Sequence, residues 1–372
     1  MNTQLVALGW NESFQQSFDS INNGKFIPAR IVRENRGEYI VNTGDNLCAV
    51  RSSGAVRDRL STSDSAPTVG DWLAVESMKA TGETLARELL PRKSRFERQV
   101  IGKKSSYQTV AANFDTLFLV SGLDGDFNPR RIQRYLSLAW NSGAQPVVIL
   151  NKSDLVSDIE LIIEAVQKIA LNAPVLAMSA LQPESLSCLY EYLAVGKTVA
   201  LLGSSGVGKS SLVNGLLGEE RLASQEVRRE DSKGRHTTTW RELIQLPDKG
   251  MIIDLPGMRE LQLTGETSGI DKSFADVLEL ATRCRFRNCS HNGEPGCAVE
   301  GAITSGELEL DRFNQFMQQQ TESAVVNARR ASRKSPITKS QRKRQEKEDY
   351  FKEIHIQLRK HAKERKKYLE DD

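Results

Sequence analysis

The chain has 372 residues, and at roughly 100–200 residues per domain this length predicts two or three domains and excludes a mini-protein held only by metal or disulfides. Hydrophobic residues make up 39% and charged residues 27%, which excludes a collagen-like or wholly disordered protein. No apolar run approaches the roughly 20 residues of a membrane-spanning helix. The first residues also lack the basic start and apolar core of a secretory signal. We therefore expect a cytoplasmic protein with no membrane contact.

The formal net charge of +3 is unevenly distributed. Residues 329–372 contain 16 Lys and Arg against 8 Asp and Glu, a net of +8, which leaves −5 for residues 1–328. Such a tail is either a solvated appendage or a surface that attracts a polyanion such as RNA. Within it, residues 327–340 predict a flexible link and residues 341–369 predict a charged helix.

Short β-rich segments in the first part of the chain predict a small barrel. Strands are expected, with polar turns between them, over residues 26–32, 38–41, 46–50 and 72–76. This spacing is typical of a five-stranded oligonucleotide-binding (OB) barrel, which we prefer, or of an SH3-like barrel.

From about residue 114, apolar strands alternate with helices. Helices are expected over residues 129–142 and 159–171, and strands over residues 116–120, 146–150, 174–178, 198–202 and 251–253. This alternation predicts a largely parallel α/β sheet covered by helices on both faces, with a nucleotide site at the carboxyl ends of its strands.

Between a predicted strand and a predicted helix over residues 211–217 stands the pattern G-x-x-x-x-G-K-S, which predicts a phosphate-binding loop. Its backbone N–H groups and the helix N-terminus would bind phosphates. Lys209 would reach the β- and γ-phosphates, and Ser210 would bind Mg²⁺. The predicted nucleotide-binding residues here are Gly203, Ser204, Ser205, Gly206, Val207, Gly208, Lys209, Ser210 and Ser211.

Asn151-Lys152-Ser153-Asp154 matches the guanine-reading pattern N-K-x-D. The Asp154 carboxylate can accept from both the ring N1–H and the exocyclic amine of guanine, a donor pair that adenine lacks, which argues against an ATPase or kinase. Asn151 would tie the loop to its surroundings, and the Lys152 stem would cover the base. Backbone N–H groups of Ser179 and Ala180 would contact the base oxygen. Alone, the pattern would also fit a solvated turn.

Asp254-Leu255-Pro256-Gly257 follows a predicted strand and matches D-x-x-G. Asp254 would bind Mg²⁺ through water, and the Gly257 N–H would contact the γ-phosphate. A plain proline turn is the alternative. Thr238 or Thr239, in the polar segment after the phosphate-loop helix, would complete the Mg²⁺ shell.

Met258 occupies the position where many GTPases carry a glutamine that orients water. Because an apolar side chain cannot do this, His236 is the candidate catalytic residue, since neutral imidazole can accept a proton or hydrogen bond from water. The alternative is an ordinary surface histidine.

A cluster near the C-terminal end predicts a structural zinc site, because three thiolates and one imidazole form a closed tetrahedral set. The ligands would be Cys284, Cys289, His291 and Cys297. Three free thiols in a small lobe are the alternative. A helix that begins at Thr304, with Glu307 completing a capping box, is expected next.

The order of the nucleotide patterns is unusual. An ordinary GTPase has its phosphate loop first and N-K-x-D later, whereas here Asn151 and Ser179 precede Gly203 and Asp254 comes last. The domain is therefore expected to be circularly permuted, which a fold with adjacent termini tolerates.

This order, the Cys/His cluster and the segments 67–72, 90–94 and 111–115 resemble the RsgA (YjeQ) family of small-ribosomal-subunit-dependent GTPases. The resemblance covers roughly residues 20–320. It implies an OB-fold domain, a permuted GTPase domain and a mainly helical zinc domain, acting late in assembly of the bacterial 30S subunit with GTP hydrolysis stimulated by that particle. It also implies zinc as the metal and places His236 on the family's proposed catalytic histidine.

The resulting prediction is a GTPase built from an OB domain (1–95), a permuted GTPase domain (96–275), a zinc domain (276–335) and a basic tail (336–372). The expected cofactors are one structural Zn²⁺ and Mg²⁺ with GTP. The expected partners are GTP and GDP, the 30S subunit and its 16S rRNA, with the chain itself a monomer. The alternative is an RNA-binding structural protein that uses guanine nucleotide only as a conformational cofactor.

Overall fold

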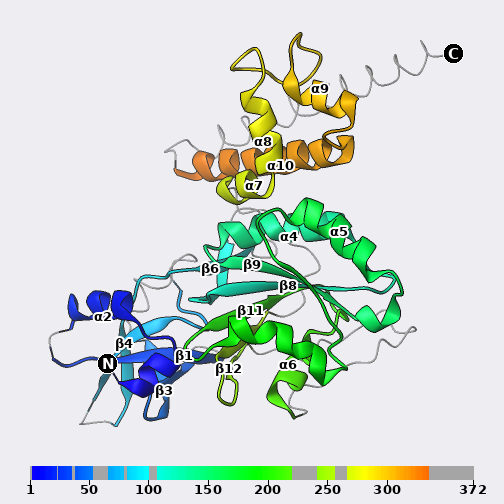
Figure 1. Ribbon diagram of the computed structural model, residues 1–372. Coiled ribbons are helices and arrows are strands. Elements are labelled where there is room, and N and C mark those ends of the chain that lie inside the picture. Colours follow the sequence, from blue (N-terminus) through cyan, green and yellow to red (C-terminus); the bar gives the residue numbers. More distant parts are fainter. Residues whose placement is uncertain are drawn as a thin grey trace, which may run out of the picture. The chain divides into compact units, whose positions relative to one another are not determined.

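A computed structural model describes residues 2–22, 24–35, 38–52, 66–78, 82–99, 107–219, 241–255 and 266–334 (Figure 1). The chain divides into two compact units, Met1–Ser323 and Ala324–Asp372, and the sites described below lie in the first. Within the described ranges, no helix is long and apolar enough to cross a membrane.

The first sheet is a closed five-stranded barrel in the order β1-β2-β3-β5-β4. Its strands are β1 (Ile27–Asn35), β2 (Glu38–Asn42), β3 (Leu47–Ser52), β4 (Trp72–Ser77) and β5 (Thr84–Leu89). β3 pairs with β5 in parallel, and the other pairs are antiparallel. Because β4 and β5 are exchanged relative to a simple meander, the barrel has the Greek-key arrangement of an OB fold, which confirms the preferred prediction.

The fifth barrel strand, β5, has no counterpart in the sequence prediction. Ala86 is its only fully buried residue, whereas Arg87 is half-buried and pairs with Glu76 across the sheet at 2.8 Å. Strands are recognised in a sequence by alternating apolar residues. Because the Arg87 side chain of β5 forms an ion pair with the neighbouring strand, β5 lacks this alternation, and the sequence does not predict it.

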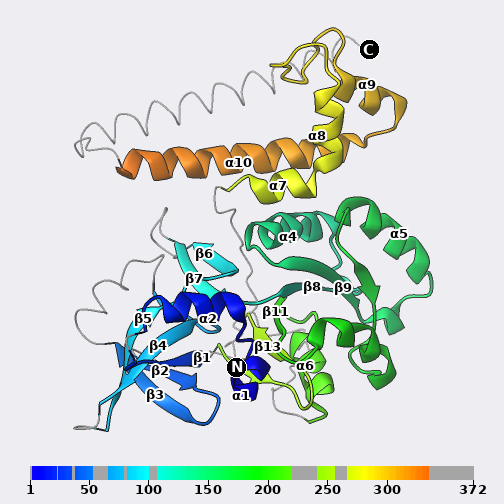
Figure 2. The same cartoon turned by 60° about the vertical axis from the view of Figure 1, so that its left-hand side comes forward.

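Two short helices, α1 (Thr3–Ala7) and α2 (Glu12–Asp19), precede the barrel. Asn11 caps α2 by accepting from the Phe14 N–H at 3.1 Å. The ring of Trp10 lies 4.7 Å from that of the buried barrel residue Trp72. The ring of Phe14, in α2, lies 5.9 Å from that of Trp72, so aromatic packing holds this helix against the barrel. Figure 2 shows α2 beside the barrel strands.

The second sheet has six strands in the order β10-β9-β8-β11-β13-β12, all parallel except β12. They are β8 (Thr116–Gly122), β9 (Gln145–Asn151), β10 (Val175–Ala177), β11 (Thr198–Leu202), β12 (Leu243–Gln245) and β13 (Met251–Asp254). The predicted strands are confirmed within one or two residues. The sequence does not predict β12, because its three residues are too few to show a pattern.

Helices cover both faces of this sheet (Figure 1). α4 (Pro129–Asn141) and α5 (Ile159–Ala170) lie on one face, and α6 (Lys209–Leu217) and the 3-10 helix η2 (Pro183–Leu193) lie on the other. Alternate residues of β8 bury into opposite cores, Leu117 and Leu119 into one and Phe118 and Val120 into the other. The α/β prediction is confirmed.

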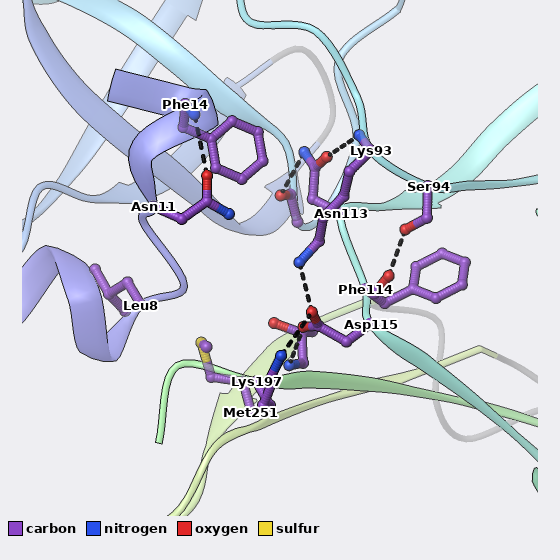
Figure 3. Close-up of polar contacts among 12 residues, drawn as sticks. Leu8, Asn11, Phe14, Lys93, Ser94, Asn113, Phe114, Asp115, Lys197 and Met251 are labelled. Carbon is purple, nitrogen blue, oxygen red and sulfur yellow. Dashed lines mark hydrogen bonds and ion pairs between the residues drawn. The ribbon is translucent and has the colours of Figure 1, made fainter. Parts of the chain in front are cut away.

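The connection from the barrel to the sheet is a hairpin, β6 (Arg95–Gln99) and β7 (Tyr107–Ala112), followed by a polar junction. In Figure 3, Lys93 and Lys197 both point at Asp115, with Nζ to Oδ1 distances of 2.8 and 3.7 Å. These cations lower the pKa of Asp115 against the effect of burial. The Thr198 N–H also donates to Asp115 Oδ2 at 2.9 Å, which ties the junction to the start of β11.

Arg30 of β1 joins the barrel to the second sheet from inside the protein. It is 1% exposed, and its guanidinium donates to the Asn113 carbonyl at 2.9 Å and to Met251 Sδ at 3.4 Å. Burial lowers the pKa of Arg30 to about 10. On the surface, Arg33 of β1 pairs with Glu242, just before β12, at 2.5 Å.

The C-terminal helices are α7 (Ser268–Ser273), α8 (Ala275–Thr282), α9 (Ala298–Ser305) and α10 (Leu310–Lys334). The predicted capping box is wrong: Thr304 lies in the last turn of α9, where its hydroxyl donates to the Glu300 carbonyl at 2.8 Å, and Glu307 lies in the turn beyond. The predicted flexible link over 327–340 is wrong as far as Lys334, because α10 continues to that residue.

Candidate nucleotide and metal sites

The phosphate-loop pattern connects β11, at the middle of the second sheet, to α6. The helix begins at Lys209, two residues earlier than predicted. Lys209 is 8% exposed, and its ammonium donates to the carbonyls of Gly203 and Ser204, both at 2.8 Å. Burial lowers its pKa, and Asp254 opposes that shift. The loop thus holds a buried cation at a helix N-terminus, which is an environment suited to phosphate.

Asn151, at the end of β9, joins three of the predicted nucleotide segments. Its side chain is buried, Nδ2 donates to the Val207 carbonyl at 2.8 Å, and Oδ1 accepts from the Ala180 N–H at 2.9 Å. Gly208 has φ +95°, and a Cβ there would lie 2.2 Å from Asn151 Nδ2. The predicted tie between the N-K-x-D segment and its surroundings is therefore present, and the glycine is required by close approach as well as by backbone conformation.

Lys152 follows in the left-handed conformation, with φ 65°. Its ammonium contacts Asp124 Oδ2 at 2.5 Å and donates to the Gly206 carbonyl of the phosphate loop at 2.8 Å. Asp154 lies in the following 3-10 helix η1 (Ser153–Leu155) with its side chain exposed. The carboxylate predicted to read guanine is thus exposed to solvent. It lies in the N-K-x-D segment, whose Asn151 and Lys152 side chains bond to the phosphate loop.

Asp254 lies at the end of β13, and the parallel register sets it opposite Leu201, two residues before the phosphate loop. Its Oδ1 is buried without a hydrogen-bond partner in the described part of the chain. Burial raises the pKa of Asp254 to about 6, and Lys209 opposes the rise. A buried carboxylate oxygen without a partner fits a hard cation such as Mg²⁺, which prefers oxygen ligands.

The predicted metal ligands meet between α8 and α9. The ligand atoms of Cys284, Cys289, His291 and Cys297 all lie within 4.8 Å of one another. His291 Nδ1 lies 3.6 Å from Cys284 Sγ and 3.4 Å from Cys297 Sγ, and the two sulfurs are 4.0 Å apart. Bonds of about 2.3 Å to a tetrahedral metal place sulfurs roughly 3.8 Å apart, so the cluster fits a closed structural metal site.

Comparisons with known proteins agree with this geometry. A protein-family model described as RsgA GTPase matches residues 89–264. The "Small ribosomal subunit biogenesis GTPase RsgA" of Opitutus terrae is 42% identical over 335 residues, which cover 87% of this chain and 91% of the relative. The chain belongs to the RsgA family of GTPases. It is accordingly a member of a family of GTP hydrolases, as predicted.

Further RsgA relatives and solved structures support the assignment. The protein of the same name from Xylella fastidiosa strain 9a5c is 44% identical over 291 residues, covering 78% of this chain and 83% of the relative. The crystal structure of YloQ, "a circularly permuted GTPase", matches 86% of this chain and 99% of its own with a TM-score of 0.59 at 23% identity. YjeQ from Thermotoga maritima matches 80% and 99% with a TM-score of 0.56 at 23% identity. These two structures share the fold.

Four residues predicted to belong to the nucleotide site lie outside the described residues: His236, Thr238, Thr239 and Gly257. Conversely, sequence reasoning missed the loop between β8 and α4, residues 123–128, which supplies Asp124 to Lys152. Two acids directly after a strand of a parallel sheet could have indicated this loop, because ligand sites gather at that edge.

Proposed function

We propose that this protein binds GTP with Mg²⁺ and hydrolyses it to GDP and phosphate on the small ribosomal subunit. The observation that supports the nucleotide site most strongly is the buried Asn151, whose amide bonds the phosphate loop on one side and the Ser179-Ala180 segment on the other. A side chain with two such bonds fixes the base-binding and phosphate-binding loops relative to each other before nucleotide arrives. This lowers the ordering cost of binding.

We assign the residues of this site by their chemistry. The Asp154 carboxylate accepts from the two guanine donors, while Ser179 and Ala180 offer backbone N–H groups to the base oxygen. The loop from Gly203 to Ser211 surrounds the phosphates, and Lys209 moves from the loop carbonyls to the phosphate oxygens. A bound Mg²⁺ would neutralise developing phosphate charge, held by Ser210, by Asp254 and by Thr238 or Thr239.

Hydrolysis needs a water oxygen to form a bond to the γ-phosphorus while the bond to the β–γ bridging oxygen breaks, with the electron pair leaving on GDP. The water loses one proton to solvent and keeps the other in the phosphate product. His236 would orient that water and accept a hydrogen bond from it, and the Gly257 N–H would hold the γ-phosphate. Met258 carries no polar atom for the water-orienting task.

For the metal cluster we propose zinc in a structural role. Three thiolates and one imidazole complete a tetrahedral shell, which leaves no open position for substrate. Cys297 Sγ also accepts from the Glu300 N–H at 3.4 Å at the start of α9, so the same atom would hold the metal and cap the helix.

The partner we propose is the 30S subunit with its 16S rRNA, because the curated relatives are named as small-subunit biogenesis GTPases. The chain would act in the cytoplasm as a monomer. Its OB barrel belongs to a fold that binds oligonucleotides. The tail, with a net charge of +8 over residues 329–372, would add phosphate contacts without sequence preference.

The deciding experiment measures phosphate release from GTP by the full chain, with and without purified 30S subunits. We expect turnover to rise on addition of 30S, whereas 50S subunits at equal concentration serve as the control and leave it unchanged. A turnover near zero with 30S present would instead favour an RNA-binding protein that uses the nucleotide only as a conformational cofactor.

A further inference from the structure

Arg131, in the first turn of α4, reaches from that helix to the phosphate loop. One guanidinium nitrogen, Nη1, donates to the Ser204 hydroxyl at 2.7 Å and to Asp126 Oδ2 at 2.9 Å. The other, Nη2, donates to Asp126 Oδ1 at 3.0 Å and to the Asp126 carbonyl at 2.5 Å. Because both nitrogens are bound on the planar fork, the guanidinium has one defined orientation.

The helix itself directs this side chain. Asn128 caps α4 by accepting from the Arg131 N–H at 3.2 Å, which sets the first turn. The neighbouring Arg130 turns elsewhere, and pairs with Asp311 of α10 at 2.6 Å. Arg130 is 70% exposed at its side chain, whereas Arg131 is 29% exposed. Of these two adjacent arginines, Arg131 is the one that contacts the phosphate loop.

Ser204 is the second residue of the phosphate loop. Its carbonyl and its hydroxyl accept hydrogen bonds from two different cations, Lys209 and Arg131. Lys209 holds the loop through the carbonyls of Gly203 and Ser204. If Lys209 turns to phosphate oxygens, as the proposed function requires, those two bonds are lost. The bond from Arg131 ends on the Ser204 hydroxyl rather than on a loop carbonyl, and its cation lies outside the loop, so this bond can persist while phosphates are bound.

Charge gives Arg131 a second effect on the same loop. Asp126 is half-exposed, and its carboxylate is paired with Arg131. Without the guanidinium, an uncompensated negative charge would stand next to a loop that must accept a di- or triphosphate. Like charges at such short range weaken binding.

Resting on the proposed function, we propose that Arg131 is a positioning residue of the nucleotide site. It holds Ser204 through its side chain, orders the start of the phosphate loop and so slows the release of guanine nucleotide. Asp126 fixes the guanidinium in the required orientation.

The test is the dissociation rate of GDP carrying an N-methylanthraniloyl fluorophore, measured by stopped flow on the full chain. Charge-assisted hydrogen bonds are among the stronger ones, so Arg131→Ala should release the nucleotide about tenfold faster. Ser204→Ala should also speed release. Because both changes remove one shared bond, the double variant should release no faster than Arg131→Ala.

Arg130→Ala is the matched control, since it removes a neighbouring arginine of the same helix and should keep the wild-type rate. Arg131→Lys retains a charge but not the fork, and should give an intermediate rate even if Arg131→Ala folds poorly. Melting temperatures without nucleotide should be alike for Arg131→Ala and Arg130→Ala. Wild-type release rates in Arg131→Ala and Arg131→Lys, or additive effects in the double variant, would overturn the proposal. A wild-type protein that does not bind GDP would contradict the proposed function itself.

Discussion

Asn151→Ala is the substitution whose effect follows most directly from the structure. It removes one donor and one acceptor from a position that is 2% exposed, and leaves the Val207 carbonyl and the Ala180 N–H without their partner. Each buried polar group left unsatisfied costs about 1–3 kcal/mol. We expect the free energy of unfolding to fall by roughly 2–4 kcal/mol, because water entering the vacated space recovers part of the loss.

Nucleotide affinity should fall with stability. Without Asn151, the two loops must be ordered when the nucleotide binds. If this ordering costs about 1.4 kcal/mol, the dissociation constant for GDP rises roughly tenfold. Thermal unfolding without nucleotide and calorimetric titration with GDP measure the two effects separately. Because the affected groups belong to two different loops, both measurements should change in the same variant.

Asn151→Asp sharpens the test because it is nearly isosteric. A carboxylate can still accept from the Ala180 N–H but cannot donate to the Val207 carbonyl, and it brings a charge into a buried position. We expect it to be at least as harmful as Asn151→Ala. Asn46→Ala, at an exposed asparagine of a barrel turn, is the control and should change stability by less than about 0.5 kcal/mol. Wild-type stability and GDP affinity in Asn151→Ala would refute the reasoning.

Three further predictions concern the proposed site residues. Asp154→Asn should weaken GTP binding by at least about a hundredfold and favour xanthosine triphosphate, because the amide no longer matches the guanine donors; unchanged affinity in competition titrations would contradict this. His236→Ala should leave KM for GTP nearly unchanged and lower 30S-stimulated kcat by about 10²-fold, and wild-type kcat would remove His236 from the mechanism. Cys289→Ser should lose zinc in elemental analysis and loosen residues 276–320, since structural metal binding contributes folding free energy, while GDP still binds; wild-type protein that contains no zinc would refute the site.

Features that depend on neighbouring residues could be predicted from the sequence. Three such features are short patterns of residue types at a fixed spacing: the strand before the phosphate loop, the loop with Lys209, and the four candidate metal ligands. The order of these patterns predicted the permutation, and the periodicity of the segments predicted the main sheet. Local information was sufficient because each pattern is complete within about 15 residues.

The predictions failed at two helix boundaries in the C-terminal part of the chain. The prediction of a helix start at Thr304 followed the usual preference for Ser or Thr as a cap. Instead, α9 begins after Cys297, and the thiol of this residue, one of the four clustered Cys and His side chains, caps the helix. The flexible link was expected from charge composition, whereas α10 continues through its first half to Lys334. Composition alone does not show where a helix that begins upstream comes to its end.

The contacts between residues that are distant in the sequence became visible only in the folded chain. Asn151 and Val207 are 56 positions apart, and Arg131 and Ser204 are 73 apart, yet both pairs form hydrogen bonds. The parallel sheet causes this, because it brings the carboxyl ends of β8, β9 and β11 to one edge irrespective of chain order. Chain order therefore could not indicate Arg131, whose role depends on which strands lie side by side.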